Sequence, residues 1–441
     1  MRVLFVLEQP KKQYLYLTKL QPLGVLYIAS YLDSKGIETE VIDYNVENKS
    51  FDPKKYDLIG YSINTANIEN TLSSIDRVKK KSPNTKIVLG GPLVKLVPKK
   101  LLKNNIYALV QGEAEETFYQ LLTKNNLEKI PGLWIKKNNK IMFTGKSRPV
   151  QNLDSLPFPD LTKIPFKKYN IVLKKKKPVA SIVTSRGCPY NCIFCDHSLG
   201  FKFRARSPEN VISEIQKNLN LGVKEFWIAD DNFTMDMKRV EDICDLIIQK
   251  NLDISFSMAN GVRADRLDLR ILKKLKKAGC WMLSISPETG NNDSLKKINK
   301  GFSLNDALIA RKICKKLEIT VMSNFILGFP WEDEKSIIQT INFAKKLDAD
   351  INHFCRAIPF PGTPLWNSLK KINYSLEDKG LNFGGLKYEH PRISEKKFKY
   401  LLKKAYWETM MKPRKIIHLS KILNFKDFID LGKYALVTGN L

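Results

Sequence analysis

The chain has 441 residues, enough for two or three domains that each bury a core without disulfide bonds. It contains seven cysteines, an odd number, with three of them crowded into one short stretch, so we expect free thiols in a reducing, cytoplasmic compartment. The first residues lack the charged and then apolar pattern of a secretory leader. The longest uncharged runs are about a dozen residues, shorter than the roughly 20 of a membrane-spanning helix. We therefore expect a soluble protein, or one that contacts a membrane only peripherally.

The formal net charge of +29 suggests a polyanion-binding protein, because clustered lysine and arginine attract nucleic acids and anionic membranes. The lysines, however, come in short runs spread along the chain, many of them on the polar sides of predicted helices. That distribution favours solvated surfaces over a dedicated nucleic-acid site. A zinc-stabilised polyanion-binding protein stays as an alternative from a different class.

Residues 1–127 alternate apolar strands with helices, a pattern typical of an α/β domain with a doubly wound parallel sheet. In such sheets ligands bind in the loops that follow the strands. The candidate cofactor-binding residues at these strand ends are Ser62, Gly90, Gly91, Gly112 and Glu113. For any one of these glycines, ordinary turn chemistry is the competing explanation.

Residues 128–179 contain short strands, a proline-rich stretch and a run of lysines, so we expect a linker there. Residues 180–370 repeat strand–helix units in a way that favours a partial parallel (β/α)6 barrel. The predicted strands are residues 180–185, 224–229, 253–258, 281–286, 319–327 and 351–358. Residues 371–441 are predicted to be a mostly helical segment that caps the barrel mouth, with an amphipathic membrane-surface role as the alternative.

The stretch SRGCPYNCIFCDHSLG places Cys188, Cys192 and Cys195 on the loop after the first barrel strand. Thiolates are the usual ligands of iron–sulfur clusters and of structural zinc. A zinc site would need a fourth ligand, such as His197 or a distant cysteine. A cluster held by three cysteines instead leaves one iron open for another molecule.

The other cysteines are interpreted mainly as packing residues. Cys244, Cys280 and Cys314 fall on apolar helix or strand positions, which is typical of buried small hydrophobes. Cys355 alternates with His353 along the last barrel strand, so it is predicted either to face the barrel interior, as a catalytic candidate, or to pack in the core.

The cysteine spacing, with Phe194 directly before the third cysteine, resembles the cluster motif of radical S-adenosylmethionine (SAM) enzymes. This resemblance implies a [4Fe-4S] cluster on Cys188, Cys192 and Cys195 whose open iron binds SAM. It also implies an anaerobic enzyme that takes an electron from a reductant such as flavodoxin or ferredoxin. The electron cleaves SAM to a 5′-deoxyadenosyl radical, which abstracts a hydrogen atom from the substrate.

Three further barrel segments, WIADDNFTMD, GCWMLSISPETGN and FILGFPWEDE, resemble SAM-contacting segments of that family. The SAM-binding residues that the resemblance implies are Phe194, Asp230, Asp231, Ser286, Glu288 and Gly328. In the second of these segments this chain has Ser286, Pro287 and Glu288, so the family's usual glycine is replaced while the glutamate remains, and in the third Trp331 stands in place of a glycine. For Glu332 and Asp333, a cap or first-turn charge of the next helix is the favoured interpretation.

The N-terminal stretches PLGVLYIASYLDSKGIETEVID, IGYSIN, IVLGGP and VQGEAEETFYQLL, with LPFPDL in the linker, resemble the cobalamin-binding subfamily of radical SAM enzymes. That subfamily includes anaerobic magnesium-protoporphyrin ester cyclases and class B methyltransferases. The resemblance implies cobalamin at the N-terminal strand ends. The four histidines are residues 197, 353, 390 and 418, so the cobalt-ligating histidine of many such domains is absent, and we expect cobalamin without it.

The resemblance covers nearly the whole chain and implies cobalamin-dependent methyl transfer to an unactivated carbon. Radical cyclisation or rearrangement is the alternative. No cysteine precedes Cys188, so the second cluster of tRNA-modifying methylthiotransferases is absent, and nucleic acid is not the expected substrate. The substrate class is a small molecule, a lipid or a peptide. The sequence favours none of these and leaves the oligomeric state open.

Overall fold

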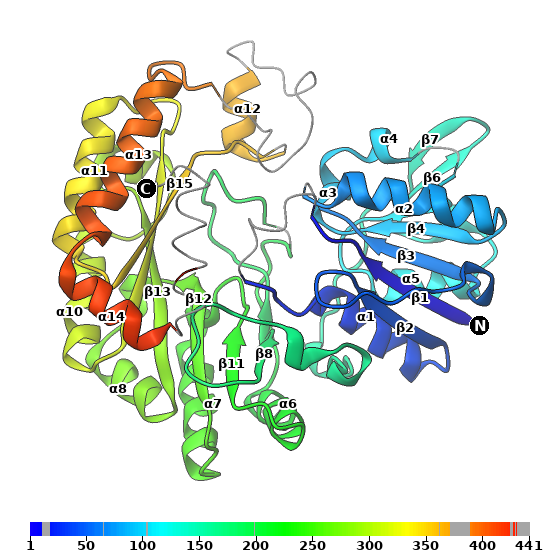
Figure 1. Cartoon of the computed structure of the whole chain (residues 1–441), viewed down its shortest axis with the longest axis horizontal. Coiled ribbons are helices and arrows are strands. Elements are labelled where there is room, and N and C mark those ends of the chain that lie inside the picture. Colours follow the sequence, from blue (N-terminus) through cyan, green and yellow to red (C-terminus); the bar gives the residue numbers. More distant parts are fainter. Residues whose placement is uncertain are drawn as a thin grey trace. The chain divides into compact units, whose positions relative to one another are not determined.

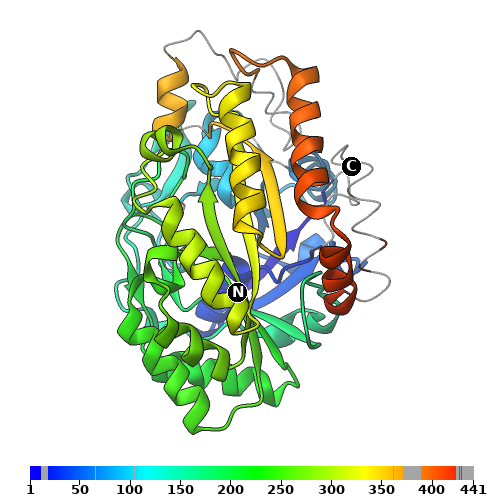
Figure 2. The ribbon, with the colours of Figure 1, turned by 90° about the vertical axis from the view of Figure 1, so that its left-hand side faces the viewer.

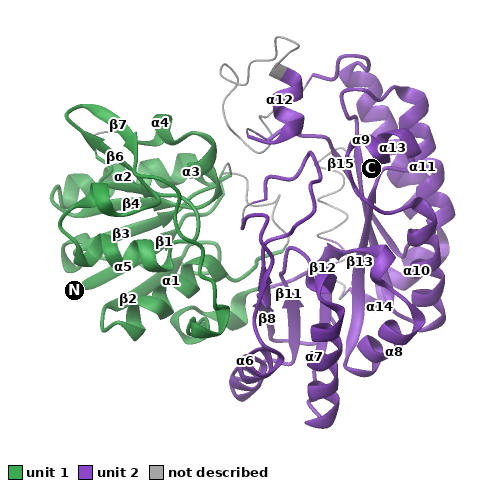
Figure 3. Cartoon of the chain, turned by 180° about the vertical axis from the view of Figure 1, so that it is seen from behind, with its two compact units in different colours: residues 1–169, 381–385 green, residues 170–380, 386–441 purple. Residues whose placement is uncertain are grey.

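The computed structural model describes residues 1–10, 18–64, 66–102, 105–197, 199–360, 362–370, 389–423, 427 and 429. Two compact units divide the chain (Figure 3). Unit 1 is mainly Met1–Tyr169, and unit 2 is mainly the chain from Asn170 onward. No helix in the described ranges is long and apolar enough to cross a membrane.

Unit 1 is built on one seven-stranded sheet with the order β2-β1-β3-β4-β5-β6-β7 (Figure 1). The strands are β1 (Arg2–Leu7), β2 (Glu38–Asp43), β3 (Leu58–Ser62), β4 (Lys86–Gly90), β5 (Ala108–Val110), β6 (Leu133–Lys137) and β7 (Lys140–Phe143). The first five pair in parallel, and the last two add antiparallel. Strand order reverses between β1 and β3, which is where doubly wound sheets bind ligands.

The sheet of unit 1 carries helices on both faces. The helices are α1 (Leu23–Ser34), α2 (Ile68–Lys81), α3 (Pro92–Leu96), α4 (Pro98–Leu101) and α5 (Glu115–Thr123). Leu4 and Val6 of β1 share a buried cluster with Ile75 of α2. Phe5, between them, packs on Phe118 of α5 with ring centroids 5.3 Å apart. Because alternate strand residues point to opposite faces, β1 is buried on both sides, as expected for a doubly wound sheet.

Residues 128–179, expected to be a linker, are divided between the units. Residues 133–143 form β6 and β7, which extend the sheet of unit 1. The part that follows is tied back to the same unit, because the Tyr169 hydroxyl donates to the Asp43 carboxylate at 2.6 Å. The proline-rich stretch is therefore part of the first unit, and the change of unit falls at residue 170.

Unit 2 is a six-stranded, all-parallel sheet with the order β15-β14-β13-β12-β11-β8. Its strands are β8 (Val179–Ile182), β11 (Glu225–Ile228), β12 (Ser255–Val262), β13 (Cys280–Glu288), β14 (Thr320–Leu327) and β15 (Ile351–Arg356). Each of the six predicted strands is present. Within the described ranges β8 and β15 are the two edges, so the barrel is partial, as expected.

Helices cover the outer side of this sheet (Figures 1 and 2). They are α6 (Pro208–Asn220), α7 (Met237–Gln249), α8 (Leu269–Lys277), α10 (Leu304–Lys316) and α11 (Glu334–Leu347). Two shorter helices, α9 (Asn292–Lys297) and α12 (Pro364–Lys370), pack instead with the loops at the carboxyl ends of the strands. Most begin at a short polar residue that accepts a hydrogen bond from the first turn. These N-cap residues are Ser207, Asp236, Asp268, Asn291, Ser303 and Asp333.

The described C-terminal helices are α13 (Glu395–Met410) and α14 (Pro413–Ile422). Helix α13 packs on α11 and on the edge strand β15 (Figure 2). The Tyr406 hydroxyl pairs with the main chain of Phe354, accepting from its N–H at 3.1 Å and donating to its carbonyl at 3.0 Å. The described part of the expected capping segment thus covers an edge strand. Residues 371–388 lie outside the described ranges.

Five neighbouring strands contribute residues to one apolar cluster, and alternation along the strands places the following five on the inner face of the curved sheet. These residues are Trp227, Ala259, Met282, Met322 and Ile351. Two positions further along the same faces come Ser284, Asn324 and His353. The inner face therefore changes from apolar to polar toward the carboxyl ends of the strands, where barrel active sites lie.

Candidate active site

The cysteine loop, residues 187–203, leaves the barrel through a narrow neck. Ser185–Arg186 (β9) pairs antiparallel with Arg204–Ala205 (β10), which clamps both ends of the loop. Gly187 has φ of +86°, and a Cβ there would lie 2.3 Å from the Lys202 carbonyl oxygen. The Cys188 N–H donates to the Gly200 carbonyl at 3.1 Å. Only glycine fits this crossing, so Gly187 fixes where the first cysteine leaves the strand.

The three thiols lie on one loop that two neighbouring segments hold in place. Cys188, Cys192 and Cys195 are free and half-buried. The Cys195 N–H donates to the Cys192 carbonyl at 3.1 Å, while Ile193 bonds through its N–H to the Ile298 carbonyl and through its carbonyl to the Leu365 N–H. The thiols are thus available as ligands on a supported turn.

These thiols do not converge on a single point. Among the residues that the structure describes, no three histidine, cysteine or carboxylate side chains form an ion site. A cluster, unlike a zinc ion, is held through separate irons, so its ligands need no common centre. Burial raises the pKa of Cys192, and it raises that of Cys195 to about 11, so ligation must displace protons. The His197 ring stacks on Phe201 with centroids 4.0 Å apart.

Asp230 and Asp231 both contact the neck of the cysteine loop. Asp230 is buried and accepts from the Thr184 N–H, the Thr184 hydroxyl and the Ser185 hydroxyl, each at 2.6 Å. Asp231 accepts from the Gly187 N–H at 3.0 Å but keeps an exposed face. Asp230 therefore anchors the end of β8, and Asp231 is the one of the two with carboxylate surface left for a ligand.

Glu288, Lys300 and Arg263 form a charged group beside the cysteines. The Lys300 amine donates to the Glu288 carboxylate at 2.6 Å. Burial alone would lower the pKa of Lys300, but Glu288 and Cys192 outweigh it and raise that pKa, so the amine stays charged. Arg263 donates to the Lys300 and Gly301 carbonyls at 2.9 and 2.6 Å and lies 3.8 Å from the ring centroid of Tyr190. Arg263 thereby connects the end of β12 to the cysteine loop.

The polar inner wall of the barrel is formed by Ser284, Ser286 and Asn324. The Asn324 amide donates to the Ser284 hydroxyl at 2.7 Å and to the Ser286 hydroxyl at 2.9 Å. His353 faces Asn324 across the β14–β15 register. Desolvation by the surrounding protein lowers the pKa of His353 and so favours its neutral form. This wall offers neutral hydrogen-bonding groups.

Cys355 also lies on β15, where its thiol donates to the Phe325 carbonyl at 3.5 Å. Burial raises the pKa of Cys355 to about 12, so the thiol is protonated at neutral pH and is a poor nucleophile. We expect Cys355→Ala to retain at least about half of the SAM cleavage, because no ionised sulfur is lost. Quantifying 5′-deoxyadenosine from both proteins checks this, and a variant without turnover would restore Cys355 to the catalytic set.

The loop after β14 carries Gly328 and an aromatic row. Glu332 is buried and accepts from the Gly328 and Phe329 N–H groups at 2.9 and 3.1 Å. Glu332 therefore shapes this loop, unlike the helix-capping role expected for it, whereas Asp333 is the N-cap of α11 as expected. The Phe329 ring stacks on Trp331 at 5.1 Å and packs on Phe194 at 6.0 Å. Phe194 thus connects the cysteine loop to the loop of Gly328.

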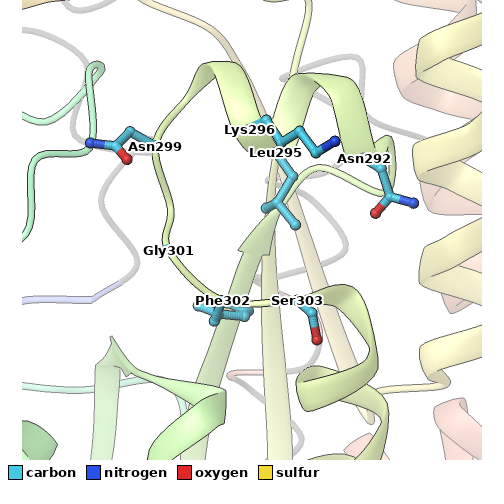
Figure 4. A pocket seen from close by; sticks show the side chains of 7 residues that line it. All are labelled: Asn292, Leu295, Lys296, Asn299, Gly301, Phe302 and Ser303. Carbon is cyan, nitrogen blue, oxygen red and sulfur yellow. The ribbon is translucent and has the colours of Figure 1, made fainter.

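A pocket lies on the segment that carries Lys300 (Figure 4). It is lined by Asn292, Leu295, Lys296, Asn299, Gly301, Phe302 and Ser303. Asn299 also contacts the cysteine loop. Its side-chain amide donates to the Asn191 carbonyl at 3.2 Å, and its main-chain carbonyl accepts from the Cys192 thiol at 3.8 Å. Asn299 therefore contacts both the pocket and the cysteine loop.

In unit 1 the expected cofactor residues lie at the carboxyl ends of the strands. Ser62 accepts through its carbonyl from the Asn67 amide at 3.0 Å, and the same amide donates to the Glu8 carbonyl at 3.3 Å. Asn67 thus joins the ends of β1 and β3 at the point where strand order reverses. A Cβ on Gly90 would have only the Val110 carbonyl within 4.0 Å, so the edge there is open.

The other three candidates in unit 1 have close local neighbours. A Cβ on Gly112 would lie 2.2 Å from the Ser147 hydroxyl oxygen, and the Glu113 carboxylate accepts from the Val150 N–H at 3.1 Å. Gly91 has φ of +102°, and a Cβ there would meet the Ile63 carbonyl oxygen at 2.5 Å. Turn chemistry therefore explains part of this glycine pattern.

We expect Gly91→Ala to lower the free energy of unfolding of unit 1 by about 3 kcal/mol, because alanine can neither adopt this backbone nor fit against Ile63. Urea unfolding followed by far-ultraviolet circular dichroism measures the change. Gly24→Ala is the matched control, since it lies in α1 with open space around it. Equal free energies of unfolding for the two variants would show that Gly91 is not required at this turn.

Sequence reasoning missed Asn67, Arg263 and Lys300. Asn67 carried no motif, and its role depends on two strand ends that meet only in the folded sheet. Arg263 stands in NGVRAD, a strand end whose glycine and acidic residue could have drawn attention to it. Lys300 follows an ordinary helix end, and no sequence signal separates it from the other lysines.

Comparison with known proteins places these residues in a family. Residues 182–344 match the radical SAM superfamily, and residues 16–122 match the B12 binding domain. An uncharacterized methyltransferase of Pyrococcus horikoshii is 32% identical over 419 residues, which cover 90% of this chain and 89% of the relative. The chain belongs to the radical SAM superfamily.

Other relatives of this radical SAM protein differ in what they do. Hopanoid C-3 methylase of Methylococcus capsulatus is 26% identical over 83% of this chain and 72% of its own length. An anaerobic magnesium-protoporphyrin IX monomethyl ester cyclase of Rubrivivax gelatinosus is also 26% identical, over 79% of this chain and 66% of its own length. The solved structure of the methyltransferase TsrM from Kitasatospora setae has the same fold, with a TM-score of 0.69 over 84% of this chain and 75% of that one, at 16% identity.

Membership of this superfamily implies a [4Fe-4S] cluster and SAM, and the B12-binding domain adds cobalamin. The residues present fit these groups. Unit 2 offers three free thiols on one clamped loop, and unit 1 offers an open sheet edge at Gly90 where strand order reverses nearby. No histidine lies in residues 1–169, so a histidine from unit 1 does not ligate cobalt.

Proposed function

We propose that this radical SAM protein transfers a methyl group to an unactivated carbon of its substrate, with its cluster held by Cys188, Cys192 and Cys195. When bound, the cluster supplies the electron that cleaves SAM, and cobalamin supplies the methyl group. The observation that carries the proposal is the clamped loop with three free thiols at the carboxyl end of β8. The methyltransferases among the relatives support methylation as the outcome.

The residues around the loop are proposed to hold SAM. Asp231 has exposed carboxylate for the amino group, and Glu288 is held beside the loop by Lys300. Ser286 lies near the carboxyl end of β13, Gly328 directly follows β14, and Phe194 packs on the loop of Gly328. Asp230 is proposed to act indirectly, because its oxygens already accept three hydrogen bonds from the neck of the loop.

In unit 1, Ser62, Gly90, Gly91, Gly112 and Glu113 are proposed to border the cobalamin. Gly90 and Ser62 lie beside the reversal of strand order, where a ligand can approach the backbone. Gly91, Gly112 and Glu113 are proposed to shape the loops rather than to contact the ligand, in view of their close neighbours.

The substrate and partners are proposed from the chemistry of the site. Enzymes of this superfamily generally use a reductant and a small-molecule substrate. We propose flavodoxin or ferredoxin as the reductant, and we keep a lipid or a peptide within the substrate class. All seven cysteines are free, which supports a reducing cytoplasm. Nucleic acid is not proposed as a substrate.

Radical cyclisation is the second candidate, because cyclases are among the relatives. The two reactions differ in the fate of the methyl group of SAM. Anaerobically purified protein, reduced and supplied with SAM carrying an isotopically labelled methyl group, is expected to form 5′-deoxyadenosine and to move the label onto its corrinoid. SAM cleavage without a labelled or retained corrinoid would favour cyclisation. No cleavage at all would overturn both.

A further inference from the structure

Helix α13 has an exposed stripe opposite its packed face. Phe398, Leu401 and Ala405 are buried. Tyr400 and Trp407 are 55% and 66% exposed, and their spacing of seven residues places them on one line along the helix. Met411, four residues further, is also exposed. Exposed apolar side chains that follow one another along one face of a helix mark an interaction surface, whereas single ones do not.

The exposed apolar side chains continue onto α14. Only two residues separate the helices, and Figure 2 shows α14 following α13. Ile417 is 56% exposed and Ile416 is also exposed, whereas Lys415 and Leu419 on the same helix are buried. We call Tyr400, Trp407, Met411, Ile416 and Ile417 the α13–α14 stripe.

The α13–α14 stripe lies in a strongly basic segment. Residues 396–423 contain nine lysines and arginines but a single acidic residue, Glu408. Glu408 is already paired with Lys345 at 2.8 Å and with Lys404 at 2.5 Å. Lys396, Lys403 and Lys421 are exposed and make no ion pair within the described part of the chain. The surface around the stripe is therefore positive and complementary to an anionic one.

This composition matches a bilayer surface better than other partners. Tryptophan and tyrosine favour the level of the lipid headgroups, and lysines extend past them to the phosphates. Aliphatic residues such as Ile416 and Ile417 gain from entering the acyl boundary but would gain little on nucleic acid, where bases stack on aromatic rings. We propose that the α13–α14 stripe docks on the surface of an anionic lipid bilayer. This inference does not depend on the proposed function.

The test is cosedimentation of the full chain with vesicles of phosphatidylcholine that contain about 30% phosphatidylglycerol, compared with pure phosphatidylcholine. We expect binding to the anionic vesicles, with most of it lost at about 0.5 M salt because exposed charges are screened. The double variant Trp407→Ser/Ile417→Ser should bind about tenfold more weakly, since two apolar anchors are lost. Both side chains are exposed, so the fold should tolerate the change.

The matched control is Leu269→Ser/Lys273→Gln on α8, which also has an exposed leucine and lysine. It should bind vesicles like the unmodified chain. Trp407 is the one exposed tryptophan, and the other five are buried or half-buried. Vesicles should therefore protect it from acrylamide quenching, and Trp407→Phe should remove that protection. Failure to bind anionic vesicles, or equal losses in the control, would overturn the inference. So would a stripe variant whose only effect is to dissociate a dimer or to release RNA.

Discussion

Replacing Cys192 with alanine is expected to abolish SAM cleavage. Each cysteine of the loop is proposed to hold a different iron, and a missing thiolate leaves an iron without its protein ligand. The loss should exceed the roughly 10–100-fold that mutation of an outer hydrogen-bonding partner costs at a metal site. The measurement is iron content after anaerobic reconstitution, together with 5′-deoxyadenosine formed on reduction. Cys188→Ala and Cys195→Ala should behave alike.

The control for the cysteine variants is Cys314→Ala, a buried thiol on α10 outside the loop. It should keep about four irons per chain, as expected for one [4Fe-4S] cluster. If a loop variant keeps its iron and its turnover, that cysteine is not a ligand. If the unmodified chain takes up zinc and no iron, the radical mechanism is wrong, and a zinc-stabilised polyanion-binding protein is favoured instead.

Asp230→Asn is expected to weaken the support of the cysteine loop. Its carboxylate accepts from the Thr184 N–H and hydroxyl and from the Ser185 hydroxyl, and an amide cannot accept all three without turning a donor toward one of them. Breaking buried hydrogen bonds to a charged group should cost about 3 kcal/mol of the free energy of unfolding of unit 2. The iron content of the reconstituted variant should fall as well. Chemical unfolding and iron analysis on the same preparation measure both effects.

Asp236→Asn is the matched control, because Asp236 is an exposed N-cap of α7 and asparagine caps helices as well as aspartate does. Its stability should change by less than about 0.5 kcal/mol. If Asp230→Asn kept full stability and iron but bound SAM poorly, Asp230 would be a direct SAM ligand, as the resemblance alone implies.

The sequence was sufficient where the signal is local. Cys188, Cys192 and Cys195 lie within one loop, and their spacing is visible without any fold. The repeat of strand and helix could be predicted because five of the six barrel strands are followed by a helix with a polar N-cap. The missing histidine in unit 1 is likewise a matter of composition.

The rest depends on pairings between distant parts of the chain. Asp230 and its partner Thr184 are 46 residues apart, and nothing near either shows that they meet. Glu332 looked like a helix cap, but its carboxylate turns back to the Gly328 and Phe329 N–H groups. β6 and β7 looked like linker strands because their antiparallel pairing onto β5 is a property of the whole sheet.

The central claim is that three cysteines hold a cluster whose remaining site binds SAM. Low-temperature electron paramagnetic resonance of the reduced, reconstituted protein tests it most directly, with and without added SAM. The account predicts the signal of a reduced [4Fe-4S] cluster that changes when SAM is added and is missing in Cys188→Ala. A cluster signal that SAM leaves unchanged, or one that persists in Cys188→Ala, would contradict it.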